Sequence, residues 1–168
     1  MADPMKIAVV GGGPSGLYFA ILMKRADAAN EVVVFEQNKP DDTFGFGVVF
    51  SDATIAEVES ADEATYRAIT DHFVHWDDID VHYGGEVVRS TGHGFSGMSR
   101  QTLLTVLQGV AAEMGVDVRY ETRVDDLEQF GAYDLVVGSD GVNSRVRELL
   151  GNRVQPTFDC RPDRKSVV

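Results

Sequence analysis

The first 36 residues read as a strand, a glycine turn, a helix and a second strand that ends on an acid. A short apolar run over 6–10 precedes the sequence GGGPSG at 11–16, a helical pattern covers 17–25, and an apolar run over 31–35 ends on Glu36. Two strands joined by a helix form a βαβ unit, in which the strands run parallel. The chain is therefore predicted to begin an α/β fold built on a parallel sheet.

The glycine turn has the spacing G-x-G-x-x-G on Gly11, Gly13 and Gly16. In this context the first glycine permits the tight turn, the second lets backbone approach a pyrophosphate, and the third allows close packing of helix on strand. The free N–H groups of the first helical turn, which Pro14 and Ser15 open, then face the phosphates. The pattern predicts a Rossmann-like dinucleotide-binding turn; a purely structural turn between strand and helix is the alternative.

Glu36 lies 20 residues after Gly16, at the end of the second strand. A carboxylate at this position accepts hydrogen bonds from the hydroxyls of an adenosine ribose. It would repel the 2′-phosphate of NADP, so the sequence favours FAD or NAD.

A second motif follows an apolar strand at 135–137, where Asp140-Gly141 forms a turn before a polar helix start. Asp140 or Asn143 capping an ordinary helix is the alternative, since both residue types favour turns and caps. The motif resembles the Asp-Gly fingerprint of FAD-dependent aromatic hydroxylases, whose turn serves the pyrophosphate–ribose region of the flavin and the nicotinamide cofactor.

Three further segments, at 41–52, 72–79 and 92–100, resemble the N-terminal flavin module of the aryl-CoA monooxygenases. The resemblance extends from residue 5 to about residue 160. It implies FAD as cofactor, NAD(P)H as transient co-substrate, and hydroxylation of an aromatic acyl-CoA of the aminobenzoyl-CoA or salicylyl-CoA type with O₂. A stand-alone FAD-binding module and an NAD(P)H-linked flavin reductase without hydroxylase activity remain the alternatives.

The resemblance also assigns roles to individual positions. Arg100, with Gln101 beside it, corresponds to the arginine that contacts the phosphate–ribitol part of the flavin, and Val124 to a residue at the adenine edge. Gly47 and Val48 are expected near the isoalloxazine ring. The full set of predicted cofactor-binding residues is Gly11, Gly13, Pro14, Ser15, Gly16, Glu36, Gly47, Val48, Arg100, Gln101, Val124, Asp140 and Gly141. No catalytic residue is assigned.

The family's enzymes continue through a substrate-covering sheet to a Gly-Asp-Ala motif, which this sequence lacks. We therefore expect residues 1–168 to form a single, incomplete FAD-binding domain with a small β-rich insertion at about 37–99. A missing C-terminal portion or a partner chain is expected, and the isolated chain should be inactive or weakly active.

Between the two motifs, apolar spacing and capping residues predict the remaining elements. They are a loop over 37–51, a helix capped by Asp52 and ending at Glu59, a helix over 63–70 capped by Asp62, strands at 79–83 and 86–89, an amphipathic helix over 100–114, a parallel strand at 116–120, and a short hairpin starting at Val124. Helices are expected on both faces of the sheet.

The net charge of −12 argues against nucleic acid or anionic membrane partners. Since FAD, NADH and CoA thioesters are anions, their site must depend on local cations and helix N-termini. Seven candidate cations are Arg100, Arg145, Arg147, Arg153, Arg161, Arg164 and Lys165.

The single Cys160 and the lack of an apolar run of about eighteen residues fit a cytoplasmic protein. His72 and His75 have no accompanying ligand cluster, so no metal site is predicted.

Overall fold

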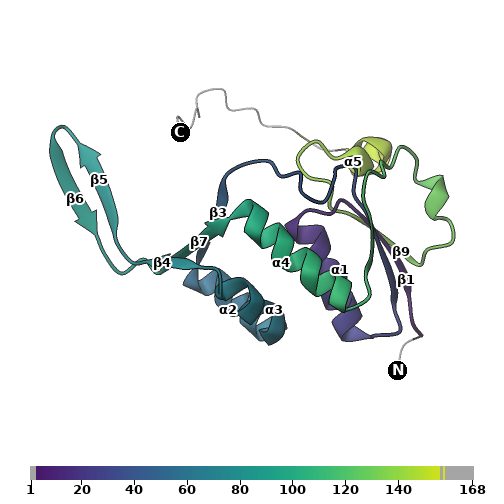
Figure 1. Ribbon diagram of the computed structural model, residues 1–168. Coiled ribbons are helices and arrows are strands. Elements are labelled where there is room, and N and C mark those ends of the chain that lie inside the picture. Colours follow the sequence, from purple (N-terminus) through teal and green to yellow (C-terminus); the bar gives the residue numbers. More distant parts are fainter. Residues whose placement is uncertain (1–2, 156, 158–168) are drawn as a thin grey trace.

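The computed structural model describes residues 3–155 and 157, and its centre is a four-stranded sheet (Figure 1). The strands are β1 (Lys6–Val10), β2 (Glu31–Phe35), β8 (Asp117–Arg119) and β9 (Leu135–Gly138). Their order is β8-β2-β1-β9, and all three pairings are parallel. The predicted parallel α/β sheet, including the strand after residue 116 and the return strand before Asp140, is therefore confirmed.

Two long helices, α1 (Pro14–Ala26) and α4 (Arg100–Glu113), lie on one face of this sheet (Figure 1). Alternate residues of β1 and β2 point toward them, since successive side chains of a strand face opposite sides. The buried set on this face includes Ile7, Val9, Val32, Val34, Leu17, Ile21, Leu103, Leu104 and Leu107. The predicted amphipathic helix over 100–114 is thus confirmed to within one residue.

The second face is covered by shorter elements: η1 (Glu128–Phe130), α5 (Arg145–Leu149) and α6 (Gly151–Val154). Its buried cluster is Ala8, Val10, Val33, Phe35, Val124, Phe130 and Val146. The predicted hairpin at Val124 is wrong. Val124 is buried in this cluster, and β9 pairs in parallel with β1, so residues 124–134 form a covering loop.

The insertion between β2 and α4 carries a separate antiparallel sheet of order β3-β7-β4. Its strands are β3 (Gly47–Ser51), β4 (Val74–Trp76) and β7 (Phe95–Ser99). The predicted loop over 37–51 therefore ends in a strand, because residues 47–51 pair with β7 throughout.

Two helices, α2 (Asp52–Ala61) and α3 (Glu63–Thr70), follow β3. Ser51, one residue before the predicted cap Asp52, accepts from Thr54 N at 3.3 Å and caps α2. Asp62 caps α3 as predicted, with its Oδ1 accepting from Ala64 N at 3.2 Å. The same carboxylate accepts from Arg25 Nε of α1 at 3.0 Å, so it ties the insertion to the main domain.

The predicted strands at 79–83 and 86–89 are confirmed as β5 (Ile79–Tyr83) and β6 (Glu86–Ser90). They form a hairpin that projects from the body of the molecule (Figure 1). Asp80 accepts two hydrogen bonds from Arg89 directly across this hairpin. Within the described residues, no helix is long and apolar enough to cross a membrane.

Candidate cofactor-binding site

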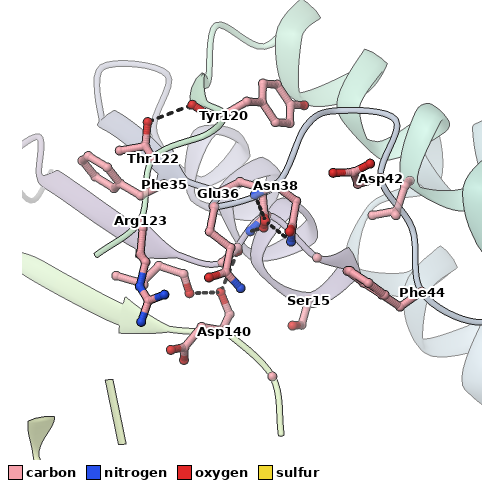
Figure 2. A pocket seen from close by; sticks show the side chains of 18 of the residues that line it. Ser15, Phe35, Glu36, Asn38, Asp42, Phe44, Tyr120, Thr122, Arg123 and Asp140 are labelled. Carbon is pink, nitrogen blue, oxygen red and sulfur yellow. Dashed lines mark hydrogen bonds between the residues drawn. The ribbon is translucent and has the colours of Figure 1, made fainter. Parts of the chain in front are cut away.

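A cavity of about 740 Å³ lies at the carboxyl ends of the parallel strands. Its walls are the segments that follow β1, β2, β8 and β9, together with part of the loop after Glu36 and the start of α4. Ligands of open α/β sheets bind in the crevice outside these strand ends. Figure 2 shows the side chains of Glu36, Asn38, Arg123 and Asp140 gathered around this space.

The two sequence motifs are in direct contact at the floor of the cavity. Gly11 has a φ of +106°, which favours glycine, and a Cβ on it would lie 2.5 Å from the Ser139 carbonyl oxygen. Ser139 Oγ donates to the carbonyl oxygens of Val10 and Gly11, both at 3.0 Å. Gly16 is equally enclosed, since a Cβ there would overlap the Gly11 carbonyl oxygen. Both glycines are therefore required by packing alone.

Gly13 differs from them, because a Cβ at Gly13 would meet nothing within 4 Å. It is the N-cap of α1, it carries no side-chain cap, and Pro14 opens the helix. The N-terminal N–H groups of a helix lack partners within it, and the helix dipole adds partial positive charge there. The open side of the turn at Gly13 therefore suits an approaching phosphate.

Glu36 is held at the rim of the cavity by three hydrogen bonds. Its Oε2 accepts from Gly12 N at 2.7 Å, and its Oε1 accepts from Asn38 N and Asn38 Nδ2, both at 2.8 Å (Figure 2). The carboxylate is thus fixed beside the glycine turn before any ligand binds.

Asp140 uses its side chain to fix the start of α5. It accepts from Ser144 Oγ and Arg145 N at 2.6 Å and from Val146 N at 3.0 Å. Burial alone would raise the pKa of Asp140, but hydrogen bonds from Ser144 and these amides outweigh it and hold the pKa below its ordinary value. The N-cap of α5 is Ser144, whose Oγ accepts from Arg147 N at 3.0 Å, and not Asp140 or Asn143. The Asp140 side chain supports the first turn of the helix from outside it, while its contact with a cofactor stays a prediction.

Three arginines that line the cavity, Arg100, Arg123 and Arg145, carry positive charge. Arg123 pairs with Asp125 at 2.9 Å and Arg145 with Glu148 at 2.9 Å, whereas Arg100 has no ion pair in residues 3–155. Thr43 and Arg145 also line the cavity. Thr43 Oγ1 and Arg145 Nε are buried and have no hydrogen-bond partner among the residues that the structure describes. A backbone-lined turn, an oriented acid and unpaired donors together fit an anionic dinucleotide.

The structure brings most of the predicted residues to this cavity. Those that line it are Gly11, Gly13, Pro14, Ser15, Glu36, Arg100, Val124, Asp140 and Gly141, and Gly16 lies beneath the turn. Their contacts with a cofactor remain predictions.

Gly47, Val48 and Gln101 do not line the cavity. The Val48 side chain packs against the main core, so any contact of Val48 with a ligand would involve its backbone. Phe46 O accepts from Arg100 N at 3.2 Å, which places the start of β3 next to a residue of the cavity wall.

Asn38, Tyr120, Thr122 and Arg123 also line the cavity, and sequence reasoning did not select them. Each follows β2 or β8, whose carboxyl ends are adjacent because the two strands pair. The sequence feature that could have identified these four residues is their position just after a predicted parallel strand. Among residues 3–155 and 157, no group of three or more His, Cys, Asp or Glu side chains gathers in a metal-binding arrangement.

These features define a Rossmann-like fold, and residues 9–45 match the family model described as an NAD(P)-binding Rossmann-like domain. The solved tetrameric form of 2-methyl-3-hydroxypyridine-5-carboxylic acid oxygenase has the same fold, with a TM-score of 0.77 at 22% identity over 89% of this chain and 43% of that one.

Two curated relatives are closer in sequence. The chain is 49% identical over 155 residues to salicyloyl-CoA 5-hydroxylase of a Streptomyces species, a match that covers 92% of this chain and 30% of the relative. It is 36% identical over 143 residues to 3-hydroxy-4-methyl-anthranilyl-(aryl-carrier protein) 5-monooxygenase of Streptosporangium sibiricum, covering 85% of this chain and 40% of the relative. The chain is therefore a homologue of monooxygenases of aromatic rings, and it spans less than half the length of these two relatives.

Proposed function

We propose that the chain is the FAD-binding portion of a flavoprotein monooxygenase that hydroxylates an aromatic acyl thioester with NAD(P)H and O₂. The observation that carries this proposal is the direct contact of the two motifs, 128 residues apart, at one cavity beside the oriented Glu36. The relatives support the substrate class, since one is named for a CoA thioester and the other for a ring on a carrier protein. For this chain we propose an aminobenzoyl-CoA or salicylyl-CoA type substrate.

Residues of this chain would bind FAD through the pyrophosphate and the adenosine ribose of the cofactor. The N-terminus of α1 and the open side of Gly13 would receive the pyrophosphate, and Glu36 would accept a hydrogen bond from the adenosine ribose. Glu36 would also exclude a 2′-phosphate by charge repulsion. The family model over residues 9–45 covers the βαβ unit that FAD and NAD sites share, so the choice of FAD follows from the Asp140-Gly141 turn and the relatives.

Arg100 would supply local positive charge that the chain as a whole, at −12, lacks. Its guanidinium has no acidic partner within the described residues, so it is available to a flavin phosphate. When bound, FAD supplies the redox and oxygen chemistry. The residues named above would hold the cofactor in place for that chemistry.

A turnover experiment separates the proposal from its alternatives. The FAD-loaded chain is mixed with NADH and either 2-hydroxybenzoyl-CoA or 2-aminobenzoyl-CoA, and products are identified by mass spectrometry. Hydroxylated product, even at a low level, supports the monooxygenase. NADH oxidation without that product supports a flavin reductase, and bound FAD with neither reaction supports a binding module.

Among the residues that line the cavity, none is identified as a cover for the aromatic ring of the substrate. We therefore expect weak turnover from these 168 residues alone. A cytoplasmic location is proposed with the function, since it supplies reduced nicotinamide cofactors and suits a chain with one cysteine.

A further inference from the structure

We propose that Asn38 is a positioning residue for the adenosine ribose, acting through the carboxylate of Glu36. This inference rests on the proposed FAD site and adds a residue that neither sequence motif contains. Asn38 lies in the loop after β2, is half-buried, and lines the cavity beside Glu36 (Figure 2).

Asn38 directs two hydrogen bonds to a single oxygen atom. Its backbone N and its Nδ2 both donate to Glu36 Oε1 at 2.8 Å. A carboxylate offers about four acceptor positions, two on each oxygen. Oε1 is therefore fully used, and Oε2, which accepts once from Gly12 N, keeps one position for a ligand. The ribose hydroxyl is expected to meet Oε2.

The loop that carries Asn38 is itself fixed by the segment that follows β8. Asn38 O accepts from Glu121 N at 3.1 Å, and Glu36 O accepts from Thr122 N at 2.8 Å. Glu121 adopts a φ of +52°, which is uncommon for a residue other than glycine. Asn38 is thus anchored through its backbone oxygen while its donors hold Glu36, so the acid needs no rearrangement when the ribose binds.

The structure therefore predicts that loss of Asn38 affects the adenosine half of FAD only. Asn38→Ala removes the Nδ2 hydrogen bond and keeps the backbone one, so the Glu36 side chain regains part of its rotational freedom, which binding must then remove. Hydrogen bonds to charged groups are strong enough that we expect Asn38→Ala to weaken FAD binding by about ten-fold. FMN, which lacks the adenosine, should bind as it does to the unaltered chain.

The experiment measures FAD and FMN affinities by flavin fluorescence for the unaltered chain, Asn38→Ala, Glu36→Ala and the double variant. Asn152→Ala is the matched control, because Asn152 is exposed and lies outside the cavity wall. We expect a selective loss of FAD affinity in Asn38→Ala that largely disappears when Glu36 is already absent. An equal loss for FAD and FMN, or an undiminished loss in the Glu36→Ala background, would overturn the proposal.

Asn38→Asp provides a second variant of the same shape should the alanine variant fail to fold. It replaces the Nδ2 donor by a carboxylate beside Glu36, so FAD affinity should fall at neutral pH and recover in mild acid. A loss that does not change with pH contradicts the positioning role. If the unaltered chain binds FMN but gains nothing from the adenosine of FAD, the ribose site is wrong; if it binds neither flavin, the proposed function itself fails.

Discussion

Alanine substitutions at Gly13 and Gly16 should separate ligand binding from folding within one turn. Gly13 has φ −72° and ψ 176°, which alanine adopts freely, and a Cβ there meets no protein atom within 4 Å. A Cβ on Gly16 would instead overlap the carbonyl oxygen of Gly11 and lie 2.6 Å from Ser139 Oγ. The two variants add the same methyl group three residues apart.

The expected magnitudes follow from these contacts. In Gly13→Ala, the poorer N-cap costs a few tenths of a kcal/mol or more, and the reduced entropy of the unfolded chain offsets about 0.4–1 kcal/mol. Its stability should therefore change by less than about 1 kcal/mol. In Gly16→Ala, alanine gains about 1 kcal/mol of helix propensity, but the overlap with backbone should exceed that gain. We expect a net loss of about 1–3 kcal/mol, or a Tm lower by several degrees.

In Gly13→Ala the affinity for FAD, unlike the stability of the fold, should fall substantially. Its methyl group would stand where the pyrophosphate approaches, so FAD should bind at least about ten-fold more weakly, which corresponds to about 1.4 kcal/mol. Urea unfolding gives the stabilities, and quenching of flavin fluorescence gives the affinities. Unchanged FAD affinity in Gly13→Ala would refute the phosphate position, and unchanged stability in Gly16→Ala would refute the packing argument.

Three further changes test other parts of the structure. Burial would raise the pKa of Asp62, but hydrogen bonds from Thr65 and Arg25 hold this pKa below its ordinary value of 3.8. The ionised carboxylate therefore stabilises the fold at pH values above 3.8, and this contribution is lost as the pH falls through the lowered pKa. Asp62→Asn should lose about 2 kcal/mol at neutral pH and much less at about pH 3 by urea unfolding; an equal loss at both contradicts this. Asp140→Asn should weaken the start of α5 and cost about 1 kcal/mol by the same measurement, and full stability would argue against a role of the Asp140 hydrogen bonds there. Gly97→Ala should shift the emission of Trp76, the chain's single tryptophan, whose ring lies 3.0 Å from the added Cβ; an unchanged spectrum would place the ring elsewhere.

The parts of the fold that follow from local sequence could be predicted. The glycine turn, the acid after β2 and the capping Asp62 lie within a few residues of the elements they define, so spacing was sufficient. The boundary at Ser51 and Asp52 was displaced by one residue because both residue types cap helices. Strand β3 was missed although Val48, Val49 and Phe50 favour strands, because the glycines and aromatic residues just before and within it are typical of a loop and its partner β7 lies far along the chain.

The parts that depend on distant segments could not be predicted. Val124 is buried because it packs with Phe35 and Phe130 on the second face of the sheet, and no local pattern reports that contact. Asn38 and Arg123 meet at one cavity only because β8 pairs with β2, an order that the sequence does not specify. The roles of Asn38 and Arg123 therefore became visible with the strand order.

The visible absorbance spectrum of the purified chain, recorded after incubation with FAD and desalting, tests the central proposal most directly. Retention of about one flavin per chain is the predicted result, because the glycine turn, Glu36 and the Asp140-Gly141 turn already meet at one cavity. A colourless protein whose circular dichroism shows the expected helices and strands would contradict the proposal that this cavity binds FAD.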